Sequence, residues 1–320
     1  MPDFTQPWFT YSVCAQIVWP FLALSLNKYT NRLLTVPIAT FIFSVCAVLP
    51  WTVPASEPAV RFVLIIPCFW VAARTVEIIE RHARNDDVFI KPKRFLVWVL
   101  VFGDAVCVDQ PEKKDECRQR GRRSAIRVAL KAIAVTSLLA INSSFPLQQY
   151  FWLELLWMMF IVYTVFSGLT DLIHTPFLLM GIDTAPVFNA PFLARNLRDF
   201  WGRRWNLFFT RICNRLIFQK LIGPERPVLG ATTVFLFSAI LHEYMVWVSL
   251  ERFDGRMLLF FTLHGFATIA TTMVAHWVGR KTLMPRIPAI MLHFVFFTAT
   301  APLFFGPVSE IFRFHTWTLW

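Results

Sequence analysis

Hydrophobic residues in this sequence gather into long blocks that contain no Asp, Glu, Lys or Arg. The clearest blocks are Trp8–Leu26, Leu33–Trp51, Ala132–Gln149 and Met257–Val278. Each reaches the ~18–20 residues that a helix needs to cross a hydrocarbon layer of ~30 Å. None shows the sustained two-residue alternation of a membrane β-strand. The pattern therefore predicts an all-α, polytopic membrane protein.

Weaker blocks between the clear ones complete the layout. Together they predict about eight membrane-spanning helices: 8–26, 33–51, 62–79, 128–145, 150–170, 228–250, 257–278 and 287–306. The third is the weakest, because its uncharged core Phe62–Ala73 has only twelve residues and lies between Arg61 and Arg74. We expect a single integral membrane domain over 1–320, with a motif-bearing core at 171–306.

Composition excludes several classes of protein. Hydrophobic residues make up 56% of the chain and charged residues 16%, whereas soluble domains carry about 25% charge. A soluble cytosolic enzyme, a DNA-binding module and a secreted disulfide scaffold are therefore not expected. Six cysteines occur without CxxC spacing, so no zinc site is expected either.

The net charge of +11 is explained by the position of the basic residues. Of 31 Lys and Arg residues, 27 fall in the connections on one side of the predicted spans. Such an excess marks the cytoplasmic side and favours contact with lipid head groups over nucleic acid. The long connections 80–127 and 171–227 are thus predicted to be cytoplasmic, and both ends of the sequence to face the other side.

A dense aromatic and basic segment, RNLRDFWGRRWNLFF, occupies 195–209. On a single helix the polar side chains would share one face: Arg195, Asp199, Arg203 and Asn206. The opposite face would hold Trp201, Trp205 and Phe208. One interpretation is an interfacial anchor with an Asp199–Arg203 ion pair at i, i+4. The other is an active-site helix, and Asn206 is the residue that the anchor leaves unexplained.

His242 and Glu243 lie inside the apolar block Val228–Leu250. Ionisable side chains at this depth are costly and indicate a functional site by default. A histidine that ties two helices by a hydrogen bond is the structural alternative. Val246 occupies the position where an HExxH zinc motif needs its second histidine. The other intramembrane histidines, each taken singly, are interpreted as packed polar residues: His264, His276 and His293.

Three segments taken together resemble a known family. PFLARNLRDFWGRRWN (191–206), LHE (241–243) and FFTLHG (260–265) are similar to the wax synthase branch of the membrane-bound O-acyltransferases, which includes plant long-chain-alcohol O-fatty-acyltransferases. The likeness is concentrated in 191–265. It implies a membrane-bound O-acyltransferase architecture and transfer of an acyl group from acyl-CoA to the hydroxyl of a lipophilic, long-chain alcohol.

The resemblance also implies roles for particular residues. His242 matches the family's catalytic histidine, which would remove the hydroxyl proton. Asn206 matches its polar partner, which would stabilise the oxyanion or orient the acceptor. The remaining motif residues are assigned to acyl-CoA binding: Trp201, Arg203, Arg204 and Trp205. Glu243 ranks low as a partner of His242, because adjacent helix positions point about 100° apart. No metal or prosthetic group is expected.

Other functions stay open at this point. An acetyl- or acyltransferase acting on a sterol or terpenoid hydroxyl is the alternative within the enzyme class. A lipid transporter is disfavoured because the chain shows neither internal repeats nor paired broken helices, and a non-catalytic scaffold would not need His242. The membrane is expected to be the endoplasmic reticulum in a eukaryote or the inner membrane in a bacterium. The sequence does not indicate an oligomeric state.

Overall fold

The computed structural model describes residues 32–82, 95, 97, 105–107, 110–145, 147–279 and 284–313. The chain divides into two compact units built from discontinuous segments. The first takes the residues up to Gly121 with 173–185 and 247–252, and the second takes 122–172, 186–246 and the residues from Phe253 onward. The predicted span 8–26 lies outside the described residues.

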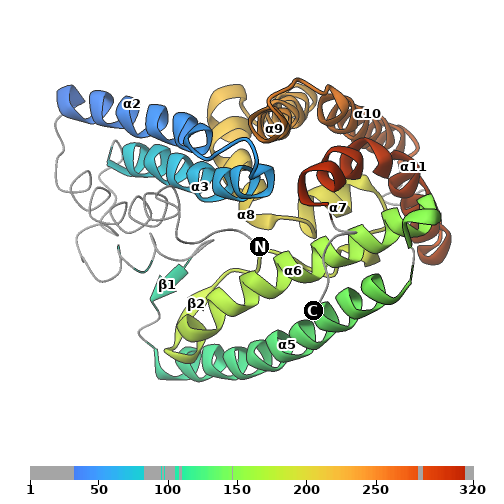
Figure 1. Cartoon of the computed structure of the whole chain (residues 1–320). Helices are drawn as coiled ribbons and strands as arrows, with labels where there is room; N and C mark the ends of the chain where they lie inside the picture. The colour runs from blue at the N-terminus through green and yellow to red at the C-terminus, as the bar shows by residue number, and fades with distance from the viewer. Residues whose placement is uncertain are drawn as a thin grey trace. The chain divides into compact units, whose positions relative to one another are not determined.

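Helices account for nearly all of the regular structure (Figure 1). They are α2 (Arg32–Val48), α3 (Pro58–His82), α5 (Pro111–Ser144), α6 (Phe151–Leu179), α7 (Leu197–Arg203), α8 (Leu207–Cys213), α9 (Pro227–Leu250), α10 (Arg256–Trp277) and α11 (Arg286–Phe312). Shorter helical turns are η1 (Leu49–Thr52), η3 (Leu147–Gln149), η4 (Pro191–Leu193) and the π-helical η5 (Asn214–Ile222). A single small antiparallel pair joins β1 (Ala105–Cys107) to β2 (Ile182–Thr184) among the described residues.

Within the described part of the chain, six helices are long and apolar enough to cross a membrane: α3, α5, α6, α9, α10 and α11. Each corresponds to one predicted span. The predicted span 33–51 is occupied by the shorter α2 and the turn η1. The all-α, polytopic architecture is therefore confirmed, and the chain is an integral multi-pass membrane protein. The count of eight stays a prediction.

Helix α3 runs well past the twelve uncharged residues that marked it as the weakest span. The Arg61 guanidinium at its start donates to the Val53 carbonyl at 2.8 Å and to the Val248 carbonyl at 2.9 Å. Further along, Arg74 pairs with Glu77 at 2.5 Å, and both side chains are buried. Buried charges are tolerated when they are paired and hydrogen-bonded. The helix can thus continue through residues that hydropathy alone treats as its limits.

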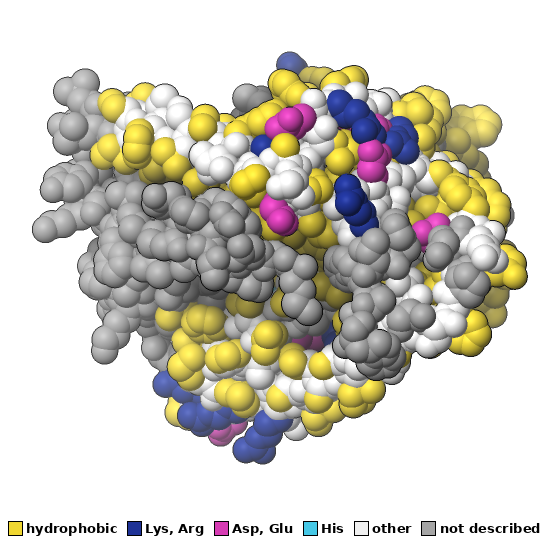
Figure 2. Space-filling view, in the orientation of Figure 1, with side chains coloured by type: hydrophobic (Ala, Val, Ile, Leu, Met, Phe, Trp, Pro, Cys, Tyr) yellow, Lys and Arg dark blue, Asp and Glu magenta, His cyan; other side chains and the backbone are white. Residues whose placement is uncertain are grey.

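Helix α5 begins 17 residues before the predicted span 128–145. Its 34 residues correspond to about 51 Å, at 1.5 Å per residue, which exceeds a hydrocarbon layer of ~30 Å. Lys and Arg side chains gather over its first turns (Figure 2). Exposed apolar side chains follow at Ile126, Leu130 and Ile133. The last part of the predicted loop 80–127 is therefore a helical extension of the span.

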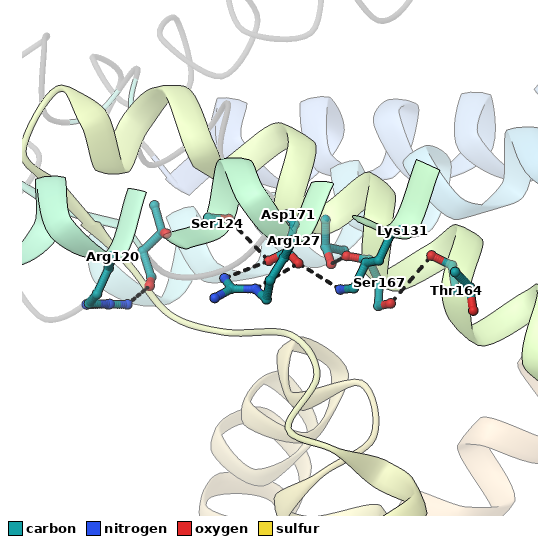
Figure 3. Close-up of polar contacts among 9 residues, drawn as sticks. Arg120, Ser124, Arg127, Lys131, Thr164, Ser167 and Asp171 are labelled. Carbon is teal, nitrogen blue, oxygen red and sulfur yellow. Dashed lines mark hydrogen bonds and ion pairs between the residues drawn. The ribbon is translucent and has the colours of Figure 1, made fainter. Parts of the chain in front are cut away.

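An ion-pair cluster joins α5 to α6 within the second unit (Figure 3). Asp171 of α6 accepts hydrogen bonds from Lys131 at 2.7 Å, from Arg127 at 3.0 Å and from Ser124 at 3.3 Å. The three donors are spaced by three and four residues, so they share one face of α5. The Asp171 and Lys131 side chains are only 17% and 22% exposed, so this pair is screened less than a surface ion pair.

Candidate active site

His242 lies on α9 with one ring nitrogen engaged. Its Nδ1 is 2.8 Å from the carbonyl oxygen of Ser238, one helical turn earlier. A carbonyl can only accept, so Nδ1 holds the proton and Nε2 keeps its lone pair. The ring packs on Phe261, with centroids 4.3 Å apart, and remains partly exposed. None of the described residues hydrogen-bonds to Nε2. With Nδ1–H engaged, Nε2 is the nitrogen that carries the lone pair when the ring is neutral.

His264 of α10 differs because both of its ring nitrogens are used. The Trp201 indole N–H donates to Nδ1 at 3.2 Å, and Nε2 lies 2.9 Å from the Thr300 hydroxyl oxygen. An indole is only a donor, so Nδ1 accepts and Nε2–H donates to Thr300. The side chain is fully buried. This agrees with the interpretation of His264 as a packed polar residue and leaves it no free base.

The predicted helix over 195–209 is wrong, because the chain is helical in two pieces. Helix α7 ends at Arg203, and α8 begins at Leu207. Between them Asn206 adopts a left-handed backbone conformation, with φ 41° and ψ 59°, which asparagine tolerates better than most residues. Its side-chain oxygen accepts from the Phe209 backbone N–H at 3.2 Å, so Asn206 is the N-cap of α8. Its amide nitrogen donates to none of the described residues.

The predicted Asp199–Arg203 pair is also wrong. Asp199 instead accepts from Nε of Arg204 at 2.8 Å. Nη1 of Arg204 also donates to the carbonyls of Asn189, at 3.3 Å, and Ala190, at 3.1 Å. Asp199 and Arg203 are both within α7, and it is Arg204, directly after the helix, that takes the carboxylate. The Arg203 side chain is exposed and has no partner in the described part of the chain.

The two tryptophans of the motif pack inside the protein. Trp201 lies against Phe261, with centroids 5.7 Å apart, and Phe261 also contacts His242. The motif on α7 and the histidine on α9 therefore share one aromatic neighbour on α10. Trp205 stacks on Phe200 with an interplanar angle of 13° and a centroid distance of 5.5 Å. Both rings are partly buried and packed against other aromatic side chains.

Glu243 does not contact the imidazole next to it. Its carboxylate accepts from the backbone N–H groups of Asp254, at 2.8 Å, and Gly255, at 2.6 Å. These groups lie where α10 begins. This geometry agrees with the expectation that Glu243 is not the partner of the His242 imidazole.

Cys213, at the end of α8, is 1% exposed. Burial raises the pKa of its thiol to about 12, so the thiolate is scarce near neutral pH and the residue is a poor nucleophile. Within the described residues, no group of three or more His, Cys, Asp and Glu side chains is placed to hold a metal ion.

These features define a class of protein before any relative is considered: a multi-span membrane protein with a histidine inside an apolar helix and a tryptophan-rich turn that shares an aromatic neighbour with it. Residues 184–263 match the model of the Membrane bound O-acyl transferase family. The match includes the whole of the tryptophan-rich segment 195–209, the LHE motif and the beginning of α10. The resemblance inferred from these motifs is therefore confirmed over this region.

Individual relatives that match this chain carry acyltransferase names. The chain is 31% identical over 137 residues to Acyl-CoA--sterol O-acyltransferase 1 of Arabidopsis thaliana, over 40% of each chain. It is 34% identical over 116 residues to Long-chain-alcohol O-fatty-acyltransferase of Simmondsia chinensis, over 33% of each. Probable long-chain-alcohol O-fatty-acyltransferase 11 of Arabidopsis thaliana is 31% identical over 179 residues, 51% of this chain and 38% of the relative. The chain spans about two fifths of the length of the curated relatives it matches.

The two arginines of the turn are expected to differ in their effect on stability. Replacing Arg204 with Gln removes its ion pair with Asp199 and two hydrogen bonds to carbonyls. Loss of a charged, partly buried hydrogen-bond donor lowers the free energy of unfolding by ~1–3 kcal/mol. The apparent Tm should therefore fall by several degrees. Replacing exposed Arg203 with Gln should leave the Tm unchanged. Thermal unfolding of the detergent-solubilised variants measures both, and equal Tm values for the two would contradict the structural role of Arg204.

Proposed function

We propose that this protein is an acyl-CoA-dependent O-acyltransferase that esterifies a lipophilic, long-chain alcohol. The observation that supports this most directly is the state of His242. Its Nδ1–H is held by the Ser238 carbonyl at 2.8 Å, and Nε2 is left as a base inside an apolar helix. An alcohol attacks a thioester slowly until a base takes its proton, and imidazole suits that task near neutral pH.

The reaction needs one proton to be moved twice. Nε2 of His242 takes the hydroxyl proton as the alcohol oxygen forms its bond to the thioester carbonyl carbon. When the tetrahedral intermediate collapses, the carbon–sulfur bond breaks, and the imidazolium returns the proton to the departing thiolate. The products are an ester and free CoA–SH, and His242 ends neutral. The apolar surroundings restrict water, which would otherwise compete with the alcohol.

Asn206 is proposed as the hydrogen-bond donor to the oxyanion of that intermediate, or to the acceptor hydroxyl. Its carbonyl oxygen is occupied by the cap on Phe209, so the side chain is fixed with its NH₂ group available. A fixed donor of this kind is worth about 10²–10³-fold in rate where it meets developing negative charge.

The phosphates of CoA require cations at the water boundary. Arg195, Arg198 and Arg203 are exposed on and beside α7, and none of their guanidinium groups pairs with a described residue. On the predicted topology they face the cytoplasm. Arg204 and the two tryptophans, first expected to bind acyl-CoA directly, are proposed to act by holding the turn that presents these arginines.

Two kinds of acceptor are considered, a fatty alcohol and a sterol or terpenoid hydroxyl. The matched relatives include one named as a sterol acyltransferase and one named as a long-chain-alcohol acyltransferase. The long-chain alcohol is preferred on the wax synthase likeness and on physical grounds. Each buried methylene contributes ~0.8 kcal/mol, which favours long chains where a site opens to lipid. The membrane is proposed to be the endoplasmic reticulum in a eukaryote or the inner membrane in a bacterium.

His242→Ala should abolish acyl transfer while the protein still inserts and accumulates. Loss of general-base catalysis costs ~10²–10⁴-fold in rate. His276→Ala is the matched control, because this exposed histidine at the end of α10 has no proposed role and should leave the rate unchanged. Esters formed from palmitoyl-CoA and a fatty alcohol in isolated membranes are the measurement. More than about a tenth of the normal rate in His242→Ala would make His242 structural.

Asn206→Asp should lower kcat by about 10²-fold with little change in KM for acyl-CoA. Aspartate tolerates the left-handed conformation and keeps an oxygen for the Phe209 cap, but it lacks the NH₂ donor. Asn206→Gly is a control for the backbone conformation. Glycine adopts the left-handed conformation easily, but it removes both the capping oxygen and the NH₂ donor. Steady-state kinetics and a thermal melt separate the two effects. A fully active Asn206→Asp would show that Asn206 acts only as a cap.

A competition assay addresses donor and acceptor together. Membranes receive equal concentrations of acetyl-CoA and palmitoyl-CoA with an equimolar mixture of a fatty alcohol and a sterol. The palmitoyl ester of the fatty alcohol should predominate in the extracted neutral lipids. Predominant sterol ester would favour the alternative acceptor, and predominant acetate would reject the long-chain donor while leaving the His242 mechanism intact.

A further inference from the structure

Glu243 is a buried carboxylate whose use the proposed reaction does not explain. It is 4% exposed and lies next to His242 in a helix that is otherwise apolar around it. His242 already has the Ser238 carbonyl on Nδ1, so Glu243 is not needed to fix its tautomer. A carboxylate in this environment is strongly unfavourable unless hydrogen bonds compensate its desolvation.

The compensation comes from the backbone at the start of α10. Oε1 accepts from the N–H groups of Asp254 and Gly255, at 2.8 and 2.6 Å, and Oε2 lies 3.4 Å from the N–H of Leu258. The first N–H groups of a helix have no partner within it, and the helix dipole favours a negative charge there. Gly255 is the N-cap residue, with φ 82°, and the first N–H group of the helix, that of Arg256, donates to the Asp254 carboxylate at 3.3 Å. Glu243 therefore caps the start of α10 from another helix, mainly through the two residues that precede it and within the helix through Leu258.

This cap fixes α9 against α10 one residue away from the proposed base. Helix α10 supplies Phe261, whose ring lies 4.3 Å from the His242 ring and also contacts Trp201. Ala239, one turn before Glu243 on α9, packs in the same core as Phe260 and Phe261. The position of His242 relative to these rings is thus set by the contact that Glu243 holds.

We propose that Glu243 is a positioning residue for acyl transfer: by capping α10 it holds the His242 imidazole in register with Phe261 and the tryptophan-rich turn. This rests on the proposed function. The carboxylate takes no proton in the reaction. What it contributes is acceptor geometry, and a neutral acceptor of the same shape can supply most of it.

Glu243→Gln and Glu243→Leu distinguish these roles in the full-length, membrane-embedded protein. Gln keeps a carbonyl oxygen for the Asp254 and Gly255 N–H groups, so kcat should stay within about fivefold of normal, since neutral hydrogen bonds are roughly half as strong as charged ones. Leu keeps the volume but no acceptor, and kcat should fall about 10²-fold, the cost of misplacing a catalytic group by ~1 Å. KM for acyl-CoA should be unchanged in both. Glu251→Gln is the control, because the Glu251 side chain is 52% exposed and pairs with Arg61.

Amide hydrogen exchange of residues 253–259 provides a measurement that does not depend on activity. Protection should persist in Glu243→Gln, and exchange should accelerate about tenfold or more in Glu243→Leu. A Gln variant as inactive as His242→Ala with its protection intact would overturn the proposal, because the charge would then act in the chemistry. Unchanged exchange in the Leu variant would also overturn it. Absence of acyl transfer in the unmodified protein would reject the proposed function, and the exchange data would still test the cap.

Discussion

A polar atom in the hydrocarbon layer must find its hydrogen-bond partner within the protein, because neither lipid nor water supplies one there. This requirement accounts for the polar side chains of the described helices. Arg61 uses the carbonyls of Val53 and Val248, and Glu243 takes the N–H groups of Asp254 and Gly255, directly before α10. His264 is satisfied at both nitrogens. Nε2 of His242 and the buried Nδ1 of His293 are histidine nitrogens that lack a hydrogen bond in the described helices, and of these the LHE motif points to His242.

Hydrogen bonds from the motif's own side chains also stabilise the turn that joins the two helices of the tryptophan-rich segment. A turn exposes backbone groups that need partners, and the side chains of the motif provide them. Asn206 caps α8, and Arg204 donates to two carbonyls while pairing with Asp199. Much of the motif is therefore used to build the turn. The groups that the turn does not use are the Asn206 NH₂ and the exposed arginines. The proposed reaction assigns hydrogen bonding to the oxyanion or acceptor to the former and binding of the CoA phosphates to the latter.

Sequence periodicity and hydropathy predicted the parts of this fold that depend on local composition. The long apolar blocks became helices, and His242 stood out because an ionisable group in such a block is rare. Contacts between distant residues were not predictable in this way. The partners of Glu243 lie 11 to 15 residues away beyond the end of α9. The charges that made 62–79 look weak are paired in the folded chain. The break at Asn206 was missed because helical spacing was extended through a residue that prefers caps and turns.

Among the described residues no carboxylate hydrogen-bonds to His242, and this has a chemical consequence for the proposed reaction. In serine proteases an aspartate stabilises the imidazolium that forms as the nucleophile is deprotonated, whereas here the described partners of Nδ1 are the uncharged carbonyl and hydroxyl of Ser238. An imidazolium in apolar surroundings is therefore disfavoured and must be short-lived. A thioester suits such a base, because a thiol with a pKa of about 8.5 leaves far more readily than an alkoxide and accepts the proton as it departs. A histidine without a charged partner is thus compatible with acyl transfer from a thioester to an alcohol. It is much less compatible with cleavage of an ordinary ester or amide.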